Sequence, residues 1–254
     1  MNLFIGYMDK RYVRLYMIGV CIPARNEEAS IVACLASVTG AAAHPGLAGQ
    51  PVHVVVVHDS RSDRTAALAS HWPIVQLHVR SRNVGLARAA GARHLTQAGS
   101  KWLAFTDADT TVSTSWLVDQ LSLRAQVVCG TVEVSDWSSH GIYADRARAE
   151  FLENYCDRDE HRHVHGANLG IDANVYQQVG GFEALACSED QALVDKLEQS
   201  GAKIAWSALP RVITSTRPVS RVQGGFATTL RRAWPQADSG SLAESSIHPP
   251  ERRM

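Results

Sequence analysis

The sequence has no surplus of charge of either sign. Lysine and arginine together number 25, as do aspartate and glutamate, so the formal net charge is zero. Proteins that bind nucleic acid by neutralising phosphates carry a basic surplus, so we do not expect nucleic acid as a partner. Lysine itself is scarce, and arginine, which suits paired hydrogen bonds to phosphate and carboxylate, supplies most of the positive charge.

Paired cysteines and long apolar runs are also missing. The five cysteines are odd in number and no two are spaced C-x-x-C, which argues against a disulfide framework and a structural zinc site. We therefore expect reduced thiols and a cytoplasmic location. The longest strongly apolar run, residues 52–57, is too short to span a bilayer.

Composition sets both ends of the chain apart from residues 17–234, which we expect to form the domain. Residues 1–16 mix aromatic and basic side chains without a continuous apolar core, which is not the pattern of a signal peptide. They are either an N-terminal arm, compatible with contact at the inner face of a membrane, or a misassigned start before Met17. Residues 235–254 are rich in serine, proline and charge, a composition typical of disorder.

Apolar strands and helices alternate in the first half of the domain. Strands are predicted at 17–22, 52–57, 74–79 and 102–105, with helices between them around 31–38, 63–70 and 84–98. This order predicts an α/β fold with a Rossmann-like, mostly parallel sheet covered by helices on both faces. The first helix is expected to follow an N-cap at Asn26, with Glu27 and Glu28 in its first turn.

The second half is less regular. Its predicted helices are 116–123, 140–156 and 188–200, and its predicted strands are 126–134, 165–171, 204–206 and 212–213. Residues 40–51 are predicted to be a loop, and Gly180-Gly181-Phe182 a tight turn. Ser188 and Gln191 fit a capping box at the start of the last helix, which Gly201 ends.

Polar side chains follow all four strands of the first half, at the ends where ligands bind in open α/β sheets. The residues after the first strand are Pro23, Ala24, Arg25, Asn26 and Glu27, and those after the other three are Asp59, Asn83 and Asp107-Ala108-Asp109. The sequence therefore predicts a ligand site along one sheet edge.

Asp107 and Asp109 directly follow an apolar strand. In extended backbone, alternate residues project to one side, so both carboxylates would face the same ligand. Hard divalent cations such as Mg²⁺ prefer carboxylate oxygens and keep room for phosphate oxygens and water. The alternative is a solvated turn, in which aspartate is common.

The order of these segments resembles a family 2 glycosyltransferase of the GT-A fold, over about residues 18–216. The matching residues are Pro23-Ala24-Arg25-Asn26-Glu27, Asp59, Asn83-Val84-Gly85-Leu86-Ala87-Arg88, Asp107-Ala108-Asp109, Gly180-Gly181-Phe182 and Ser188-Glu189-Asp190. The resemblance implies a nucleotide-diphosphosugar as the sugar donor, Mg²⁺ or Mn²⁺, inversion at the anomeric carbon and one carboxylate base. It also implies a donor half at about 17–110 and an acceptor half at about 111–234.

The resemblance assigns the sugar-donor site residue by residue. Residues 23–27 border the nucleoside, and Asp59 resembles an aspartate that contacts the base or ribose. His58 stands where the family often has a second acidic residue. Asn83 and Arg88 flank the base and phosphates. The last residues of the set are Asp107 and Ala108 beside the ribose, with Asp107 and Asp109 as metal ligands.

Asp190 resembles the catalytic base of the family. Its carboxylate would take the proton of the acceptor hydroxyl, which belongs to a lipid, a polysaccharide or a small metabolite. The alternative is that Glu189 and Asp190 only complement the dipole of the helix that they begin.

Two further stretches are open to more than one interpretation. His161, His163 and His165 would share one face of a strand and form a metal cluster, or they lie in a polar loop on the acceptor side. Arg217 or Arg221 would close over the diphosphate, as C-terminal arginines of the family often do, or they form a solvated basic surface.

Two other functions compete with glycosyl transfer. A sugar nucleotidyltransferase usually has a glycine-rich loop and a basic residue after the first strand, where this chain has residues 23–27. A catalytically silent sugar-nucleotide-binding module would not need Asp107, Asp109 and Asp190, all of which are present.

Overall fold

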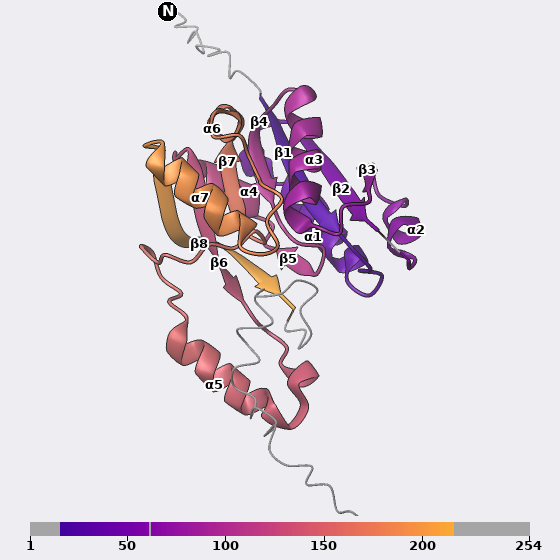
Figure 1. Ribbon diagram of the computed structural model, residues 1–254, viewed down its shortest axis with the longest axis vertical. Helices are drawn as coiled ribbons and strands as arrows, with labels where there is room; N and C mark the ends of the chain where they lie inside the picture. Colours follow the sequence, from indigo (N-terminus) through magenta and orange to yellow (C-terminus); the bar gives the residue numbers. More distant parts are fainter. Residues whose placement is uncertain (1–15, 61, 216–254) are drawn as a thin grey trace, which may run out of the picture.

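The computed structural model describes residues 16–60 and 62–215, and its centre is one eight-stranded sheet. The strand order is β3-β2-β1-β4-β7-β6-β8-β5 (Figure 1). The strands are β1 (Met17–Ala24), β2 (Val52–Asp59), β3 (Val75–Val79), β4 (Ser100–Phe105), β5 (Thr110–Val112), β6 (Val127–Glu133), β7 (Leu169–Asp172) and β8 (Ile204–Thr214).

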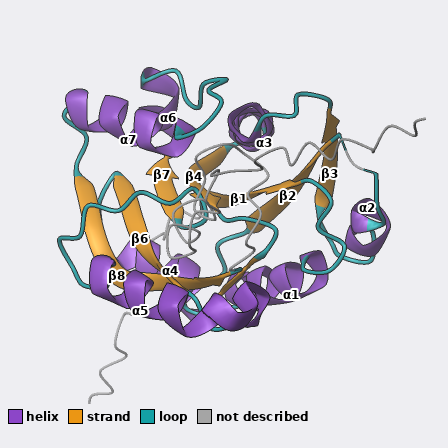
Figure 2. Ribbon diagram, turned by 60° about the horizontal axis from the view of Figure 1, so that its bottom comes forward, coloured by secondary structure: helices purple, strands orange, loops and turns teal. Residues whose placement is uncertain are grey.

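Helices cover both faces of this sheet (Figure 2). The α-helices are α1 (Ile31–Ala42), α2 (Thr65–Ala69), α3 (Val84–Gln97), α4 (Trp116–Ser122), α5 (Ala144–Asn154), α6 (Ala173–Gln178) and α7 (Glu189–Gln199), and the 3-10 helices are η1 (Pro45–Leu47) and η2 (Ser138–Tyr143). Helices α1 and α4 pack on one face and α3, α6 and α7 on the other. The predicted α/β fold with helices on both faces is confirmed.

The four strands of the first half are parallel neighbours, so their carboxyl ends share one edge of the sheet. Strand β7 runs antiparallel to both β4 and β6, and β5 runs antiparallel to β8, so the sheet is mixed beyond β4. In the register of β4 and β7, Phe105 lies opposite Leu169. The chain that enters β7 therefore lies beside the chain that leaves β4.

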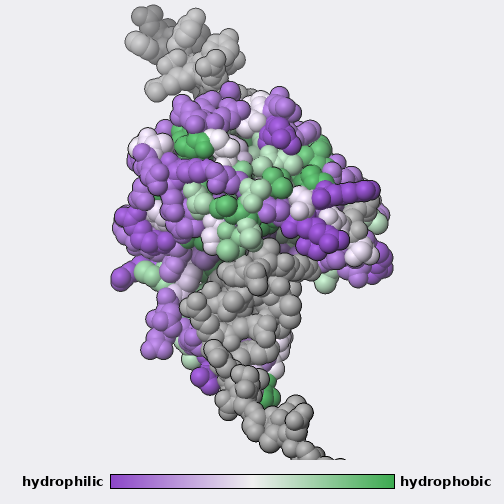
Figure 3. Space-filling view, viewed as in Figure 1, coloured by the Kyte–Doolittle hydropathy of each residue, from purple (hydrophilic) through white to green (hydrophobic). Residues whose placement is uncertain are grey.

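Strands β1 and β2 are apolar along their length because both faces of the sheet are covered. Val20 and Ile22 pack in the core on the α1 side, whereas Cys21 between them packs in the core on the α3 side. Burial of each such valine or isoleucine side chain stabilises the fold by about 1.5–3 kcal/mol. Figure 3 shows one face of the molecule, where polar residues dominate the rim and apolar residues gather toward the centre.

Several predicted element boundaries are wrong, and tertiary contacts explain them. Helix α1 begins at Ile31 after Ser30, because Asn26 adopts a φ of 55° and hydrogen-bonds to Ser62 instead of capping a helix. Ser188 also has a positive φ, 58°, and its side chain makes no capping hydrogen bond, so the predicted capping box with Gln191 does not form.

Other boundaries shift because paired strands and helices extend beyond the local signal. The predicted loop at 40–51 contains the end of α1 and all of η1. The two short strands predicted at 204–206 and 212–213 are one strand, β8, because it pairs with both β6 and β5. Strand β7 begins at Leu169, not at residue 165, and β5 and α6 were not predicted.

The described residues contain no helix long and apolar enough to cross a bilayer. All five cysteines are free, as expected. The predicted N-terminal arm, apart from Tyr16, and the tail at 235–254 lie outside the described residues.

We predict that Gly91→Ala destabilises the protein, because α3 crosses β1 and β2 at this glycine. A Cβ there would overlap Sγ of Cys21 and lie 3.0 Å from Cγ2 of Val57. Overpacking of this kind costs about 1–3 kcal/mol. Gly40→Ala in α1 is the matched control, since its Cβ would meet only Cγ2 of Thr114 at 3.8 Å.

The control substitution should stabilise the protein by about 0.4–1 kcal/mol through the lower entropy of its unfolded chain. Urea denaturation measures both free energies of unfolding. Equal stabilisation of the two variants would show that α3 does not approach the sheet as closely as described.

Candidate active site

The loops that follow β1 and β2 are tied to each other at the sheet edge. Oδ1 of Asn26 accepts the backbone N–H of Ser62 at 2.9 Å, and Nδ2 of Asn26 donates to Oγ of Ser62 at 3.1 Å. The N–H of Glu27 donates to Oγ1 of Thr65 at 2.8 Å. Pro23 and Ala24 lie in β1 itself, where they pair with β2. Residues 23–27, including Arg25, therefore form one segment at the edge of the sheet that contacts with β2 and the loop after it hold in place. The sequence predicts the nucleoside beside this segment.

Asp59 organises the loop between β3 and α3. Its carboxylate accepts the backbone N–H groups of Ser81 at 2.9 Å, Arg82 at 2.9 Å and Asn83 at 2.8 Å, and the Ser81 hydroxyl at 2.8 Å. Burial alone would raise the pKa of Asp59, but hydrogen bonds from Arg82, Ser81, Asn83 and Ser60 outweigh it and hold the pKa below its usual value. Asp59 is therefore ionised and fixed in place.

The side chains of Asn83 and His58 also form hydrogen bonds with other residues of the chain. Oδ1 of Asn83 caps α3 by accepting the N–H of Leu86 at 2.9 Å, and its Nδ2 donates to the carbonyl of Leu185 at 2.7 Å. His58 is buried, and its Nε2 lies 2.7 Å from Oε1 of Gln76. The histidine at the position where an acidic residue is common thus lies in the sheet interior.

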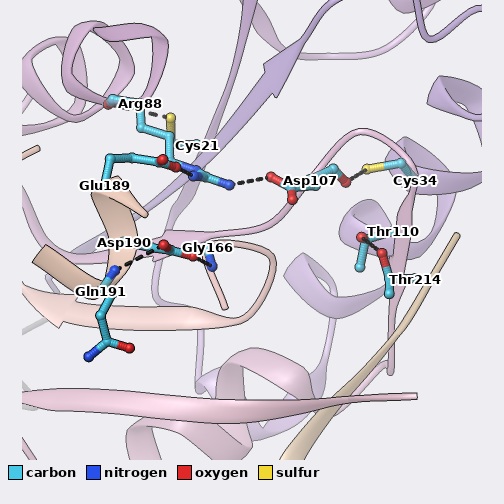
Figure 4. A network of polar contacts seen from close by, with 10 residues as sticks. All are labelled: Cys21, Cys34, Arg88, Asp107, Thr110, Gly166, Glu189, Asp190, Gln191 and Thr214. Atoms are coloured by element: carbon cyan, nitrogen blue, oxygen red, sulfur yellow. Dashed lines mark hydrogen bonds and ion pairs between the residues drawn. The ribbon is translucent and has the colours of Figure 1, made fainter. Parts of the chain in front are cut away.

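Arg88 lies at the centre of the site, between the loop after β4 and the start of α7 (Figure 4). Only 3% of the residue is exposed. One terminal nitrogen donates to Oδ1 of Asp107 at 2.6 Å, and the other donates to Oε1 of Glu189. Burial alone would lower the pKa of Arg88, but the nearby carboxylates of Asp107, Glu189 and Asp190 raise it. The guanidinium therefore stays charged.

Glu189 is the most deeply buried carboxylate of this cluster, at 5% exposure. Burial raises the pKa of Glu189 above its usual value, and the charge of Arg88 opposes that rise. The ionised form of Glu189 therefore depends on Arg88, its ion-pair partner.

Asp107, Ala108 and Asp109 lie in a turn between β4 and β5, which corrects the expected extended backbone. The Asp107 side chain is 33% exposed, and Arg88 binds its Oδ1. Asp109 is half-buried and Ala108 is buried. Cys34 of α1 also holds this turn, because its thiol donates to the Asp107 carbonyl at 3.4 Å.

The carboxylates of Asp107 and Asp109 fit a divalent ion that takes its remaining ligands from a substrate and from water. Within residues 16–60 and 62–215, no group of three or more His, Cys, Asp or Glu side chains is arranged to hold a metal. Asp107 and Asp109 would therefore supply only part of the ligands that such an ion needs. Mg²⁺ is commonly held in this way, by one or two carboxylates together with substrate phosphates and water.

Asp190 is held by backbone amides on both of its carboxylate oxygens. Oδ2 accepts the N–H of Gly166 at 2.8 Å and Oδ1 accepts the N–H of Gln191 at 2.9 Å (Figure 4). Gly166 fits between Asp190 and Arg88 only because it lacks a side chain, since a Cβ there would overlap the guanidinium. The structure therefore brings Arg88, Asp107, Glu189 and Asp190 together, although they come from three separate segments.

The three histidines of the 161–165 stretch lie in a loop and contact aromatic rings. Tyr155 stacks on His163 with ring centroids 4.3 Å apart, and its hydroxyl lies 3.0 Å from Nε2 of His165. Burial, with the charges of His163 and His161, lowers the pKa of His165 to about 3. The described residues form no metal cluster here, which supports the loop interpretation.

Two supporting residues, Tyr155 and Asn168, make side-chain contacts that sequence reasoning did not predict. Tyr155 also accepts the N–H of Val132 at 2.8 Å, so it joins the end of α5 to β6. Asn168 is fully buried, and it accepts the indole N–H of Trp116 at 2.9 Å and donates to the carbonyl of Thr131 at 2.8 Å. The available signal in the sequence was a single asparagine between Ala167 and Leu169, just before an apolar strand. Arg217 and Arg221 lie outside the described residues.

Residues 19–180, more than half of the chain, match the family model described as glycosyl transferase family 2. A search of curated proteins by sequence finds no match. The comparison with solved structures finds similar folds in several glycosyltransferases.

TarS from S. aureus is 16% identical, with a TM-score of 0.61 over 80% of this chain and 37% of TarS. The mannosyltransferase PcManGT from Pyrobaculum calidifontis, solved with GDP-Man and Mn²⁺, is 16% identical, with a TM-score of 0.59 over 85% of this chain and 60% of PcManGT. GalNAc-T7, solved with UDP, GalNAc and Mn²⁺, is 14% identical, with a TM-score of 0.60 over 87% of this chain and 48% of that one. At these identities the likeness is one of fold, and this chain spans about one third to three fifths of the solved proteins' length.

Asp59→Asn should destabilise the protein in a pH-dependent way. Its folded pKa is depressed, so its stabilising contribution is fully present above the unfolded pKa and is lost as pH falls through the folded pKa. The free energy of unfolding of wild type should exceed that of the variant by about 1–3 kcal/mol at pH 7. This difference should disappear as the pH falls below about 4.

Urea denaturation at several pH values gives this difference. Glu153→Gln on the exposed side of α5 is the control, and its small effect should not follow the same curve. A gap between wild type and Asp59→Asn that stays constant down to about pH 3 would contradict the hydrogen-bonded carboxylate.

Proposed function

Because the chain belongs to glycosyl transferase family 2, we propose that it transfers a sugar from a nucleotide-diphosphosugar to an acceptor hydroxyl, with metal dependence and inversion of the anomeric carbon. One observation carries the proposal. Arg88 and its carboxylate partners join a metal-ligand candidate, Asp107, to a base candidate, Asp190, at the carboxyl edge of the sheet.

The proposed site for the sugar donor is the edge formed by the ends of β1, β2, β3 and β4. The nucleoside borders residues 23–27 and the loop that Asp59 fixes, within reach of Asn83. Solved relatives of similar fold support this class of ligand, because TarS 1–349 was solved with UDP and with UDP-GlcNAc and PcManGT with GDP-Man. The acceptor half at about 111–234 then binds a lipid, a polysaccharide or a small metabolite.

Asp107 and Asp109 are the residues that would hold Mg²⁺ or Mn²⁺. Two carboxylates without a third protein ligand suit an ion whose remaining ligands are diphosphate oxygens and water. When bound, such an ion stabilises the negative charge that develops on the leaving diphosphate. Mn²⁺ in the PcManGT and GalNAc-T7 structures supports this choice of metal.

Asp190 acts in the proposal as the general base. Its oxygens accept the amides of Gly166 and Gln191, which orient the carboxylate and leave a further lone pair on each oxygen. The carboxylate takes the proton of the acceptor hydroxyl as that oxygen attacks the anomeric carbon. Attack from the face opposite the leaving diphosphate inverts the configuration at that carbon.

The released product separates this function from the competing ones. A glycosyltransferase releases a nucleoside diphosphate, whereas a sugar nucleotidyltransferase releases or consumes pyrophosphate. A silent binding module releases neither. Incubation with UDP- and GDP-sugars, Mn²⁺ and a panel of acceptors should therefore produce UDP or GDP, and pyrophosphate as the only product would overturn the proposal.

Asp190→Asn should abolish transfer while fold and nucleotide binding remain. The amide keeps the size of the side chain but is no base, and loss of a general base costs about 10²- to 10⁴-fold in rate. One backbone N–H would face the new NH₂ group, so a modest loss of stability of about 1–2 kcal/mol is also expected. The rate of nucleoside diphosphate release measures the effect.

Asp195→Asn is the matched control, because Asp195 lies exposed on the same helix, α7. It should retain transfer. Asp190→Asn protein with a rate close to that of wild type would move the base elsewhere, with Glu189 and Asp159 as the next candidates.

Asp109→Asn should weaken nucleotide binding only where the metal contributes. Removal of one anionic ligand leaves the diphosphate charge less compensated, and a half-buried turn residue tolerates the change. Titration calorimetry with UDP and GDP, each with and without Mn²⁺, measures the effect. Asp119→Asn in α4 is the control, and an unchanged Mn²⁺ dependence in Asp109→Asn would exclude Asp109 as a ligand.

A further inference from the structure

Arg88 joins two parts of the site that are far apart in the sequence. It lies on α3, and its two partners lie 19 residues away in the turn after β4 and 101 residues away at the start of α7. The side chains of Arg88 and Glu189 are almost fully buried, whereas that of Asp107 is one-third exposed. The cation thus reaches from the protein interior to the sheet edge.

The surroundings of the guanidinium leave it little freedom to bind a ligand. Both terminal nitrogens donate to carboxylates of the chain, and the Phe182 ring lies with its centroid 5.8 Å from Cζ. Gly166 approaches so closely that any side chain there would overlap the guanidinium. An arginine that neutralises a bound phosphate would need a face open to that phosphate.

We propose that Arg88 is a positioning residue, which sets the distance between the metal-ligand turn at Asp107 and the base-bearing first turn of α7. This replaces the role at the sugar donor that the family resemblance implies for Arg88, and it rests on the proposed function of Asp107 and Asp190. Arg88 acts on Asp190 in two ways: through Glu189, its neighbour in α7, and through Gly166, which donates to Asp190.

The flat, two-pronged shape of the guanidinium is what this role requires. Lysine carries the same charge as a single ammonium group and does not reproduce a rigid fork between two carboxylates. Arg88→Lys should therefore fold, but it should no longer hold the turn at Asp107 at a fixed distance from the first turn of α7. A misplacement of about 1 Å can cost about 10²-fold in rate, so kcat should fall by that order while KM for the sugar donor changes little.

The matched variants separate positioning from charge and from acid–base chemistry. Glu189→Gln keeps an oxygen that accepts from Arg88, so its kcat should stay within about tenfold of wild type, less than the loss of a base would cause. Arg93→Lys, an exposed position on the same helix, is the control for the substitution itself. If Arg88→Lys does not fold, Arg88→Met with Glu189→Gln removes both buried charges and should fold, yet keep the low kcat.

Hydrogen exchange gives a second measure that does not need turnover. In Arg88→Lys, the amides of Gly166 and Gln191, which donate to Asp190, should exchange faster than in wild type and in Arg93→Lys. The affinity for UDP or GDP should stay close to that of wild type, both with and without Mn²⁺, because Arg88 contacts neither the nucleotide nor the metal.

The outcomes distinguish the two proposals. If the wild-type protein transfers no sugar but these amides lose protection in Arg88→Lys, the proposed function fails and the positioning role stands. A folded Arg88→Lys protein with wild-type kcat and wild-type exchange would overturn the positioning role. So would a variant that loses metal-free nucleotide affinity, because Arg88 would then contact the nucleotide itself.

Discussion

The buried positive charge of Arg88 is the interaction on which the arrangement of the site depends. Three carboxylates, from Asp107, Glu189 and Asp190, surround it, and each influences its pKa. Like charges repel strongly in a medium of low dielectric constant, so carboxylates gathered around one point need a cation among them. A buried ion pair of this kind contributes little net stability, but loss of one partner leaves a costly unpaired charge.

The topology of the sheet explains how distant segments reach that cation. Parallel strands carry the turn with Asp107 to one edge, and the antiparallel strand β7 begins at that same edge, because Phe105 pairs with Leu169. The segment with Gly166 and Asn168 therefore enters β7 beside the end of β4. The reversal of direction at β7 thus serves the site, whereas an all-parallel sheet would send this segment to the opposite edge.

The sequence sufficed for features that depend on local pattern and failed where distant partners decide. Apolar runs predicted the first strands, and the order of the strand-end motifs predicted the family. Asn26 and Ser188 looked like helix caps, but Asn26 binds Ser62 and both adopt positive φ values, which no local pattern reveals. The partners of Arg88 were hidden for the same reason, since one of them lies 101 residues away.

The hydrogen bonds that Asp59 accepts have a consequence for the energetics of recognition. Hydrogen bonds to this carboxylate, all within the chain itself, fix the backbone of Ser81, Arg82 and Asn83. When a molecule binds beside this loop, its binding free energy is therefore not reduced by the entropic cost of ordering the loop. For a flexible segment this cost is about 1–2 kcal/mol per residue. Recognition at this part of the edge is pre-organised, so its affinity reflects contacts made rather than disorder lost.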